Sequence, residues 1–162
     1  EEWQIEELRK KSETRRALDK AMDYLALRDH AAGELYQKLC RKFDAHSAAY
    51  AVARAGELGL LNDAGFARRR AAELLRKRKS RREILNDLSA KGIDRDTAAE
   101  VVEELFAEGE DGENPELATA RALVERQYAA KLAAGKRDQV AAALARRGFS
   151  HAVIREVLSD DE

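Results

Sequence analysis

Apolar residues along the chain recur at helical spacing. Leu18, Met22 and Leu25 lie three to four residues apart, and Leu35 and Leu39 continue this spacing in the next segment. Such spacing places each set on one face of an α-helix. No stretch alternates apolar and polar residues for long enough to indicate a strand. The pattern therefore predicts an all-α protein.

The helical pattern also repeats along the chain. Three segments, residues 34–44, 83–94 and 139–150, share one register of polar and apolar positions. A repeat of about fifty residues is typical of supersecondary units that are joined in series, each with a small core of its own. We therefore expect three tandem three-helix units forming an elongated, curved molecule.

A helix-ending device marks two of these repeats. Residues 91–94 read Lys-Gly-Ile-Asp, and residues 147–150 read Arg-Gly-Phe-Ser. A basic residue suits the end of a helix, glycine takes the left-handed position after it, and Asp or Ser begins the next helix. The first repeat reads Lys-Phe-Asp at residues 42–44 and lacks the glycine. Its turn should be tighter or shifted by one residue.

These signals define the expected boundaries along the chain. Residues 1–16 are half charged, with Trp3, Ile5 and Leu8 as their sizeable apolar side chains, and we expect a helix that lies on a neighbour or docks elsewhere. The three units are expected at 17–62, 63–107 and 116–162, with an acidic flexible linker at 108–115. Helices are expected at 63–79, 81–91, 95–107, 116–133, 136–147 and 151–159.

Composition narrows the class of protein. The chain is 44% hydrophobic and 38% charged, with a formal net charge of −1. No apolar run reaches the ~18 residues that a membrane span needs. One cysteine cannot form an internal disulfide. We expect a cytoplasmic, monomeric protein without membrane contact.

Catalytic signals are weak. His30, His46 and His151 are far apart in the sequence, and each lies near a predicted helix start. Cys40 falls within a predicted helix, where we expect a small buried side chain rather than a nucleophile. No phosphate-binding loop, nucleophile elbow or dinucleotide fingerprint is present. The sequence therefore predicts a binding protein rather than an enzyme, with no cofactor and no metal site.

The strongest local charge lies in residues 68–82, which contain nine bases and one acid. One hypothesis makes this segment a contact surface for phosphates or for an acidic protein groove. The alternative is a solvated helix whose bases pair with acids such as Asp87, Glu103 and Glu104. The candidate contact residues are Arg68, Arg69, Arg70, Arg76, Lys77, Arg78, Lys79, Arg81, Arg82, Arg121, Arg126, Lys136, Arg137, Arg146 and Arg147.

Three landmarks resemble the RecX family, whose members regulate the RecA recombinase. They are the joint Gly-Leu-Leu-Asn-Asp-Ala-Gly-Phe-Ala at 59–67, the opening Arg-Asp-His-Ala-Ala-Gly-Glu-Leu-Tyr-Gln-Lys-Leu at 28–39, and the close Arg-Arg-Gly-Phe-Ser-His-Ala-Val-Ile at 146–154. Departures are Ala31 where Ser often stands, Asn62 where Asp does, and the glycine missing before Phe43. They affect caps and one turn rather than the fold.

The resemblance implies a function. It implies a regulator that binds RecA and RecA–DNA filaments in the filament groove and inhibits or modulates recombinase, ATPase and co-protease activity in DNA repair, homologous recombination and the SOS response. A second hypothesis is a module that binds single- or double-stranded DNA directly, with the basic side chains of residues 68–82 on the phosphate backbone.

We expect the residues of the family landmarks to have structural roles, either in apolar packing or in helix capping. Leu60 and Leu61 should be buried at the joint, and Asn62 or Asp63 should cap the next helix. The residues with expected structural roles are Gly59, Leu60, Leu61, Asp63, Phe66, Gly148, Phe149 and Ile154.

Overall fold

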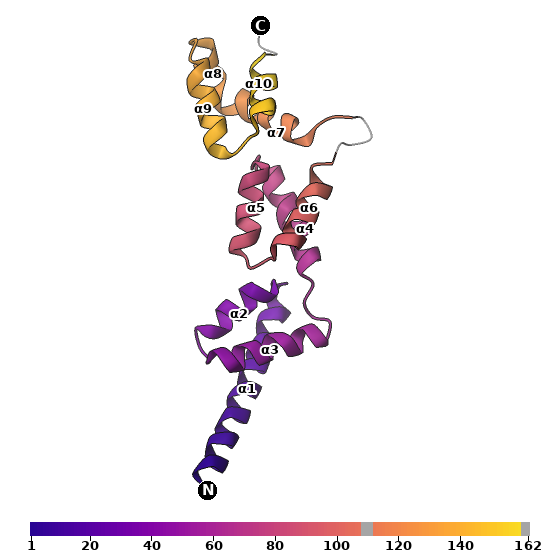
Figure 1. The fold of residues 1–162 in the computed structure, drawn as a ribbon, viewed down its shortest axis with the longest axis vertical. Coiled ribbons are helices and arrows are strands. Elements are labelled where there is room, and N and C mark those ends of the chain that lie inside the picture. Colours follow the sequence, from indigo (N-terminus) through magenta and orange to yellow (C-terminus); the bar gives the residue numbers. More distant parts are fainter. Residues whose placement is uncertain (108–111, 160–162) are drawn as a thin grey trace. The chain divides into compact units, whose positions relative to one another are not determined.

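The protein is helical throughout the part of the chain that the structure describes. A computed structural model describes residues 1–107 and 112–159, and no strand occurs in these ranges. The helices follow one another in three tandem groups, as the repeats predict (Figure 1). They are α1 (Glu2–Leu27), α2 (Ala32–Cys40), α3 (Ala45–Glu57), α4 (Asp63–Arg76), α5 (Arg81–Ala90), α6 (Arg95–Leu105), α7 (Pro115–Leu123), η1 (Val124–Tyr128), α8 (Ala129–Ala133), α9 (Arg137–Arg147) and α10 (His151–Ser159).

Contacts group the described chain into two compact units. The first consists of residues 1–67 with 91–94, and the second of residues 68–90 with the described residues from 95 onward. The turn between α5 and α6 thus packs with the first unit, although its helices belong to the second. Of the predicted acidic linker at 108–115, residues 108–111 lie outside the described residues, and Pro115 is already the first residue of α7.

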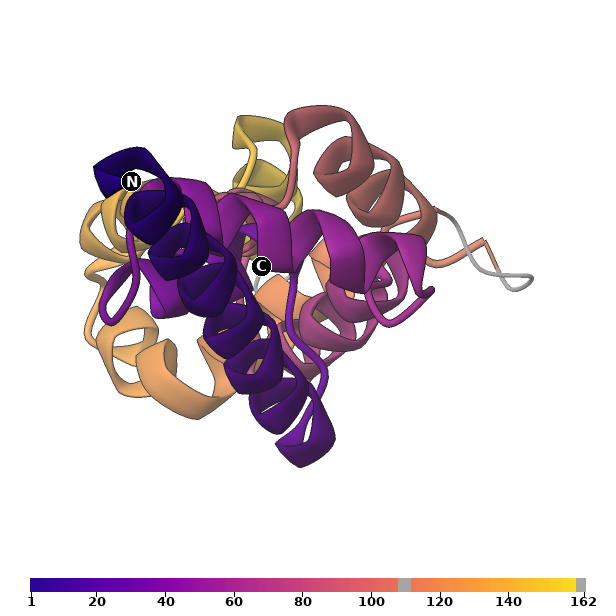
Figure 2. The same cartoon turned by 90° about the horizontal axis from the view of Figure 1, so that it is seen from below.

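The first three-helix group has a core rich in alanine. Ala17 and Ala21 of α1 are fully buried against Leu35 and Leu39 of α2. α1 also packs against α3, which contributes further buried alanines (Figure 2). Small side chains at these contacts let the helices approach closely. The alanine content noted in the sequence is therefore used for helix packing.

The first helix extends well beyond this core. α1 runs without a break from the predicted extension at 1–16 into the first group. Residues 1–12 are exposed, and Trp3, Ile5 and Leu8 are each more than 60% exposed. These side chains therefore do not lie on a neighbouring helix within the described chain.

Helix ends follow the predicted local chemistry. Gly92 and Gly148 both adopt left-handed backbone conformations, with φ of 79° and 99°. Asp44 begins α3, and its side chain accepts a hydrogen bond from the Ser47 backbone N–H at 2.8 Å. The turn before it contains no left-handed residue, which explains how it forms without glycine.

The third group has a contiguous apolar core. Leu123, Val140 and Leu144 are buried against Phe149 and Ile154. The helix predicted at 116–133 is interrupted by the π-helical turn η1, which links α7 to α8. A π-helical turn inserts one extra residue per turn, so it shifts the buried face of the helix that follows.

Candidate functional site

The basic segment spans α4, the α4–α5 turn and the first turn of α5. α4 begins at Asp63, where the Asn62 side chain accepts a hydrogen bond from the Gly65 backbone N–H at 2.9 Å. It ends at Arg76, earlier than the predicted residue 79, because Arg78 turns to a left-handed conformation with φ of 59°. The bases therefore divide between a helix surface and a turn.

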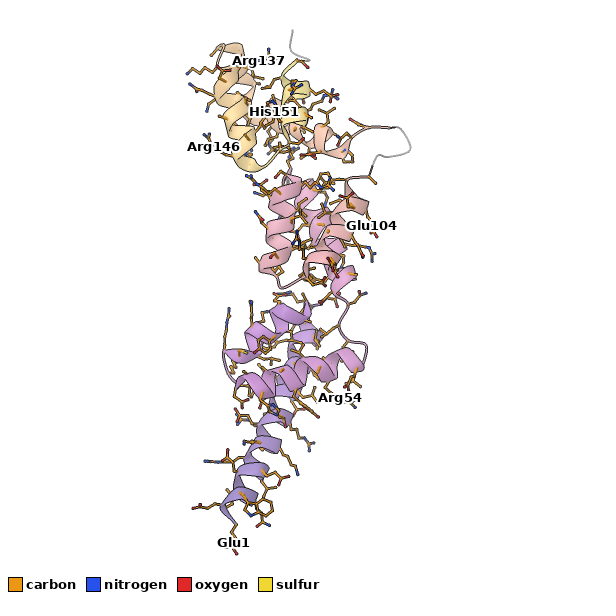
Figure 3. The ribbon with its side chains drawn as sticks, viewed as in Figure 1. Glu1, Arg54, Glu104, Arg137, Arg146 and His151 are labelled. Carbon is orange, nitrogen blue, oxygen red and sulfur yellow. The ribbon has the colours of Figure 1, made fainter. Side chains whose placement is uncertain are left out.

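Three arginines of this segment bind acids on α5 and α6. Arg70 donates two hydrogen bonds to the Asp87 carboxylate, at 2.7 and 2.8 Å. Arg68 donates to both oxygens of Glu104, at 3.0 and 3.3 Å (Figure 3 labels Glu104 on α6). Arg81 pairs with Glu103. Bidentate pairs of this kind are among the stronger charge-assisted hydrogen bonds.

The protonation equilibria reflect these contacts. The hydrogen bonds and negative charge of Asp87 raise the pKa of Arg70. The Arg68 guanidinium lowers the pKa of Glu104 through hydrogen bonds and charge. Both groups therefore stay ionised near neutral pH. The sequence also allows a solvated helix whose basic residues pair with Asp87, Glu103 and Glu104, and all three acids have arginine partners.

The two lysines of the segment have weaker partners. Lys77 Nζ lies 2.6 Å from Glu73 Oε1, and Lys79 Nζ lies 3.7 Å from Glu83 Oε1. All four side chains are at least a quarter exposed, and pairs on exposed helix surfaces contribute little to stability. These lysines can therefore leave their partners for an external anion at small cost.

Arg82 fulfils a structural role. Its Nη2 donates to the backbone carbonyl of Arg146 at 2.7 Å, at the C-terminal end of α9. The Arg82 side chain also lies against Gly148, where an added Cβ would come within 2.5 Å of its Nε. The Ser80 hydroxyl donates to the backbone carbonyl of Arg147. Cations and donors placed at a helix C-terminus satisfy its last carbonyls.

Arg76 and Arg78 differ from the rest of the segment. Among the described residues, neither guanidinium has a hydrogen-bond or ion-pair partner. Arg69 does have an interaction partner. The unpaired positive charge of the segment is thus concentrated at the end of α4 and in the turn that follows.

The predicted bases of the third group are also divided. Arg147 Nη2 donates to the Gln127 side chain at 2.9 Å, and Arg121 and Arg137 also have partners. Three exposed bases have no partner within the described ranges; they are Arg126, Lys136 and Arg146 (Figure 3 labels Arg146 on α9). The fifteen candidate residues therefore do not form one uniform set of free charges, and their role as a contact surface stays a prediction.

The joint at residues 59–67 is organised differently from the prediction in one respect. Gly59 is left-handed, with φ of 70°, and Leu61 packs against the core of the first group. Leu60, expected to be buried, is 45% exposed. The reason is that Gly59 reverses the chain, so that only one of two consecutive leucines can face the core. Phe66 is half-buried.

Both cap candidates at this joint are used, but on different helices. Asn62 caps α4, as described above. Asp63 instead accepts a hydrogen bond from the Ala32 backbone N–H at 2.8 Å, at the N-terminus of α2. Ala31 at the N-cap of α2 offers no side-chain acceptor. The Asp63 carboxylate therefore supplies the capping acceptor for α2, although it lies 31 residues from Ala32 in the sequence.

Sequence reasoning missed a buried polar cluster beside this joint. Glu34 accepts from both terminal nitrogens of Arg28, at 2.6 and 3.3 Å, and Lys91 Nζ lies 3.8 Å from the same carboxylate. Burial raises the pKa of Glu34, but the hydrogen bonds and charge of Arg28 outweigh it, with a contribution from Lys91, so its pKa lies below the usual range. Glu34 therefore remains a carboxylate in a nearly buried position.

His30 is part of the same region and is 3% exposed, not a surface residue. Its Nδ1 lies 2.9 Å from the Arg28 carbonyl, and its Nε2 lies 2.9 Å from Lys38 Nζ. Lys38 can only donate, so Nε2 accepts and Nδ1 carries the proton. Burial lowers the pKa of His30, chiefly by desolvation. The neutral ring is thus a packing element.

The described residues hold little that suggests catalysis. Cys40, expected to be buried, is exposed at the end of α2. In residues 1–107 and 112–159, no group of three or more His, Cys, Asp or Glu side chains could hold a metal ion. Over the same ranges, no helix has the length and apolar character to cross a membrane.

Models of one known protein family match two segments of the chain, which together make up 79 of its 162 residues. The family model described as RecX, first three-helix domain, matches residues 17–54, and the one described as RecX, second three-helix domain, matches residues 62–102. The first match covers most of the first helical group from residue 17 onward, and the second covers residues 62–67 of the joint, the whole basic segment and α5 and most of α6.

Individual relatives extend the similarity to the third group. The regulatory protein RecX of Halorhodospira halophila is 32% identical over 151 residues, which cover 89% of each chain. A crystal structure of RecX from Lactobacillus salivarius matches with a TM-score of 0.76 at 19% identity, over 92% of this chain and 96% of that one. A crystal structure of a regulatory protein RecX matches with a TM-score of 0.82 at 17% identity, over all of this chain and 78% of that one. The two structures share the fold, and the family matches and the identity to the Halorhodospira protein place the chain in the RecX family of regulatory proteins.

Proposed function

We propose that this chain binds the RecA recombinase and RecA–DNA filaments in the filament groove and modulates their activity. The expected effects are inhibition of strand exchange, ATPase and co-protease activity, in homologous recombination, DNA repair and the SOS response. The observation that carries the proposal is the match to a regulatory protein RecX over 89% of both chains.

A protein partner needs a surface that can bury apolar area. We assign this role to the α3 surface, defined as Tyr50, Leu58 and Leu60, which are 47%, 48% and 45% exposed. Tyr50 lies within α3, and Leu58 is the residue that follows its last turn. Arg54 lies between them (labelled in Figure 3) and pairs with Glu57 at 2.9 Å. Tyrosine is enriched in the buried core of protein interfaces, and this core is more apolar than the rest of the surface.

A titration tests the proposal. The full chain is added to RecA, single-stranded DNA and ATP at sub-stoichiometric and stoichiometric ratios, and ATP hydrolysis and strand exchange are followed. We expect progressive inhibition of both. Unchanged rates at a stoichiometric excess, with the chain shown to be folded by circular dichroism, would contradict the proposal.

A pair of variants tests the surface. In the double variant Tyr50→Ala and Leu58→Ala, we expect a loss of inhibition of at least tenfold, which corresponds to ~1.4 kcal/mol of binding free energy. The matched control is Leu27→Ala, which removes a side chain that is 84% exposed on α1. If the control loses as much inhibition as the double variant, the α3 surface is not the contact.

A second candidate function is direct binding to nucleic acid. The unpaired Arg76 and Arg78 favour it, because contacts to phosphates require cations that are free to make them. Salt separates the two candidates. Binding to a DNA backbone weakens steeply as salt rises even without RecA, whereas the first candidate requires nucleotide-bound RecA.

A further inference from the structure

The turn between α4 and α5 holds an arginine in a backbone conformation that disfavours it. The backbone N–H of Arg78 donates to the Leu75 carbonyl at 2.9 Å, and that of Lys79 donates to the Leu74 carbonyl at 3.1 Å. This pair of hydrogen bonds defines a Schellman end, whose left-handed position is usually glycine. Arg78 occupies it with φ of 59°. A side chain with a Cβ is strained there.

Three other helix ends in the chain use the same hydrogen bonds with glycine. Gly59, Gly135 and Gly148 each donate to the carbonyl three residues earlier, and the residue after each donates to the carbonyl five residues earlier. Their φ values are 70°, 72° and 99°. Arg78 is the one non-glycine residue with positive φ in the described ranges. The strain at Arg78 is thus specific to this turn, and strain of this kind is often retained at functional sites.

The Arg78 side chain does not compensate for the strain inside the protein. Its guanidinium has no partner among the described residues, and neither has that of Arg76 two positions earlier. Nearby acids are already engaged. Glu73 binds Lys77 and Arg70, and the Glu83 carboxylate accepts a hydrogen bond from the Ser80 backbone N–H.

The rest of the turn is held in place. Ser80 begins α5 with a capping box, in which its backbone N–H donates to Glu83 at 2.8 Å and the Glu83 N–H donates to the Ser80 hydroxyl at 3.2 Å. Within the second compact unit, Ser80 and Arg82 also donate to the carbonyls that end α9. These donors are used internally. An external anion would therefore be met by the Arg76 and Arg78 side chains on a fixed backbone.

The surroundings favour a phosphate backbone over an acidic protein. The large apolar side chains that are exposed within the described ranges all lie in residues 1–60. Residues 63–107 therefore present a polar surface, with eleven bases and nine acids, whereas protein interfaces have an aromatic and apolar centre and nucleic-acid interfaces are more polar. No exposed aromatic residue lies beside the turn among the described residues, so nucleic-acid bases have no aromatic side chain to stack on. Binding here would be independent of sequence.

We propose that Arg76 and Arg78 form a contact for the sugar-phosphate backbone of a nucleic acid, and that Arg78 is kept in its left-handed position for this contact rather than for stability. The proposal deepens the nucleic-acid candidate above and does not depend on RecA binding. Arg78 would bind as a fork, because a guanidinium can donate two parallel hydrogen bonds to one phosphate.

The test combines stability with binding in three substitutions at one position. Arg78→Gly removes the strain and the charge, Arg78→Asn removes the charge with a residue that tolerates the left-handed conformation, and Arg78→Lys keeps the charge. Binding to a fluorescein-labelled single-stranded oligonucleotide is followed by anisotropy between 25 and 200 mM salt. We expect Arg78→Gly to melt at or above the parent temperature and to bind at least threefold more weakly at low salt. Arg78→Lys keeps the charge but not the fork, so its affinity should lie between those of the parent and Arg78→Gly.

The double variant Arg76→Gln and Arg78→Asn measures the number of phosphate contacts. Loss of two contacts should reduce the slope of log affinity against log salt by ~1.4 for a single strand. The matched control is Arg41→Gln and Lys42→Gln, which removes two exposed cations without strain at the end of α2. The control should stay within twofold of the parent.

Several outcomes would overturn the proposal. One is a parent chain that does not bind the oligonucleotide at low salt. Another is a control pair that loses as much affinity as the double variant, because net charge alone would then explain the effect. A third is a lower melting temperature for both Arg78→Gly and Arg78→Asn, which would make the side chain a stabilising element. A double variant that binds DNA normally but no longer inhibits RecA would assign the turn to an acidic protein surface.

Discussion

A close approach of two glycines offers a sharp test of the packing in the first compact unit. Gly33, in the first turn of α2, faces Gly92, in the α5–α6 turn. A Cβ built on Gly33 would lie 2.8 Å from the Gly92 Cα and 2.9 Å from its carbonyl oxygen. Both are backbone atoms, which cannot rotate away as a side chain does. The substitution Gly33→Ala must therefore displace the turn or the helix.

The size of the effect can be worked from two opposing contributions. Overpacking of a close contact costs ~1–3 kcal/mol. Alanine at a helical position gains ~1 kcal/mol over glycine. Gly56 in α3 supplies the matched control, because an added Cβ there meets nothing within 4 Å. Both variants gain helix propensity, so the difference between them isolates the steric cost at ~1–3 kcal/mol.

Thermal unfolding followed by circular dichroism measures this difference. For a chain of this size, 1 kcal/mol corresponds to a shift of ~2–4 °C. We expect Gly56→Ala to melt slightly above the parent and Gly33→Ala to melt below it. Amide exchange at residues 91–94 should also accelerate in Gly33→Ala, because the turn is displaced from α2. If the two variants melt together above the parent, the close contact between Gly33 and Gly92 does not exist in solution.

Two further predictions concern the core and the buried histidine. Phe149→Ala should cost ~3–5 kcal/mol, because it empties a side-chain volume that is 5% exposed in the core of the third group, and a thermally silent variant would place Phe149 on the surface. Because the pKa of His30 in the folded chain lies below its ordinary value of 6.5, its contribution to stability is complete above pH 6.5 and is lost as the pH falls from there through the lowered folded-state pKa. Denaturant unfolding as a function of pH should show this loss in the parent and not in His30→Gln, and the same slope in both proteins would rule out His30 as its source.

The sequence determined the parts of this protein that depend on neighbours a few residues away. The helical spacing of Leu35 and Leu39 predicts α2. Asp44 begins α3, because its side chain accepts a hydrogen bond from the backbone N–H of the residue three positions later. The left-handed Gly92 and Gly148 also followed from the residues around them. These features depend on hydrogen bonds and torsions within one turn, so the local sequence contains all the information they need. The family landmarks are visible for the same reason.

The tertiary structure alone decided which charges are free. The basic segment has one charge pattern in sequence, but Arg70 finds Asp87 and Arg68 finds Glu104 across 17 and 36 residues, while Arg76 and Arg78 find no partner in the described chain. Packing also decides that Leu60 is exposed. It likewise decides that Asp63 caps α2, whose Ala32 lies 31 residues away in the sequence. Ion pairs and burial depend on which helix faces meet, and that is fixed by the summed packing of many side chains. A charge count along the chain cannot supply it.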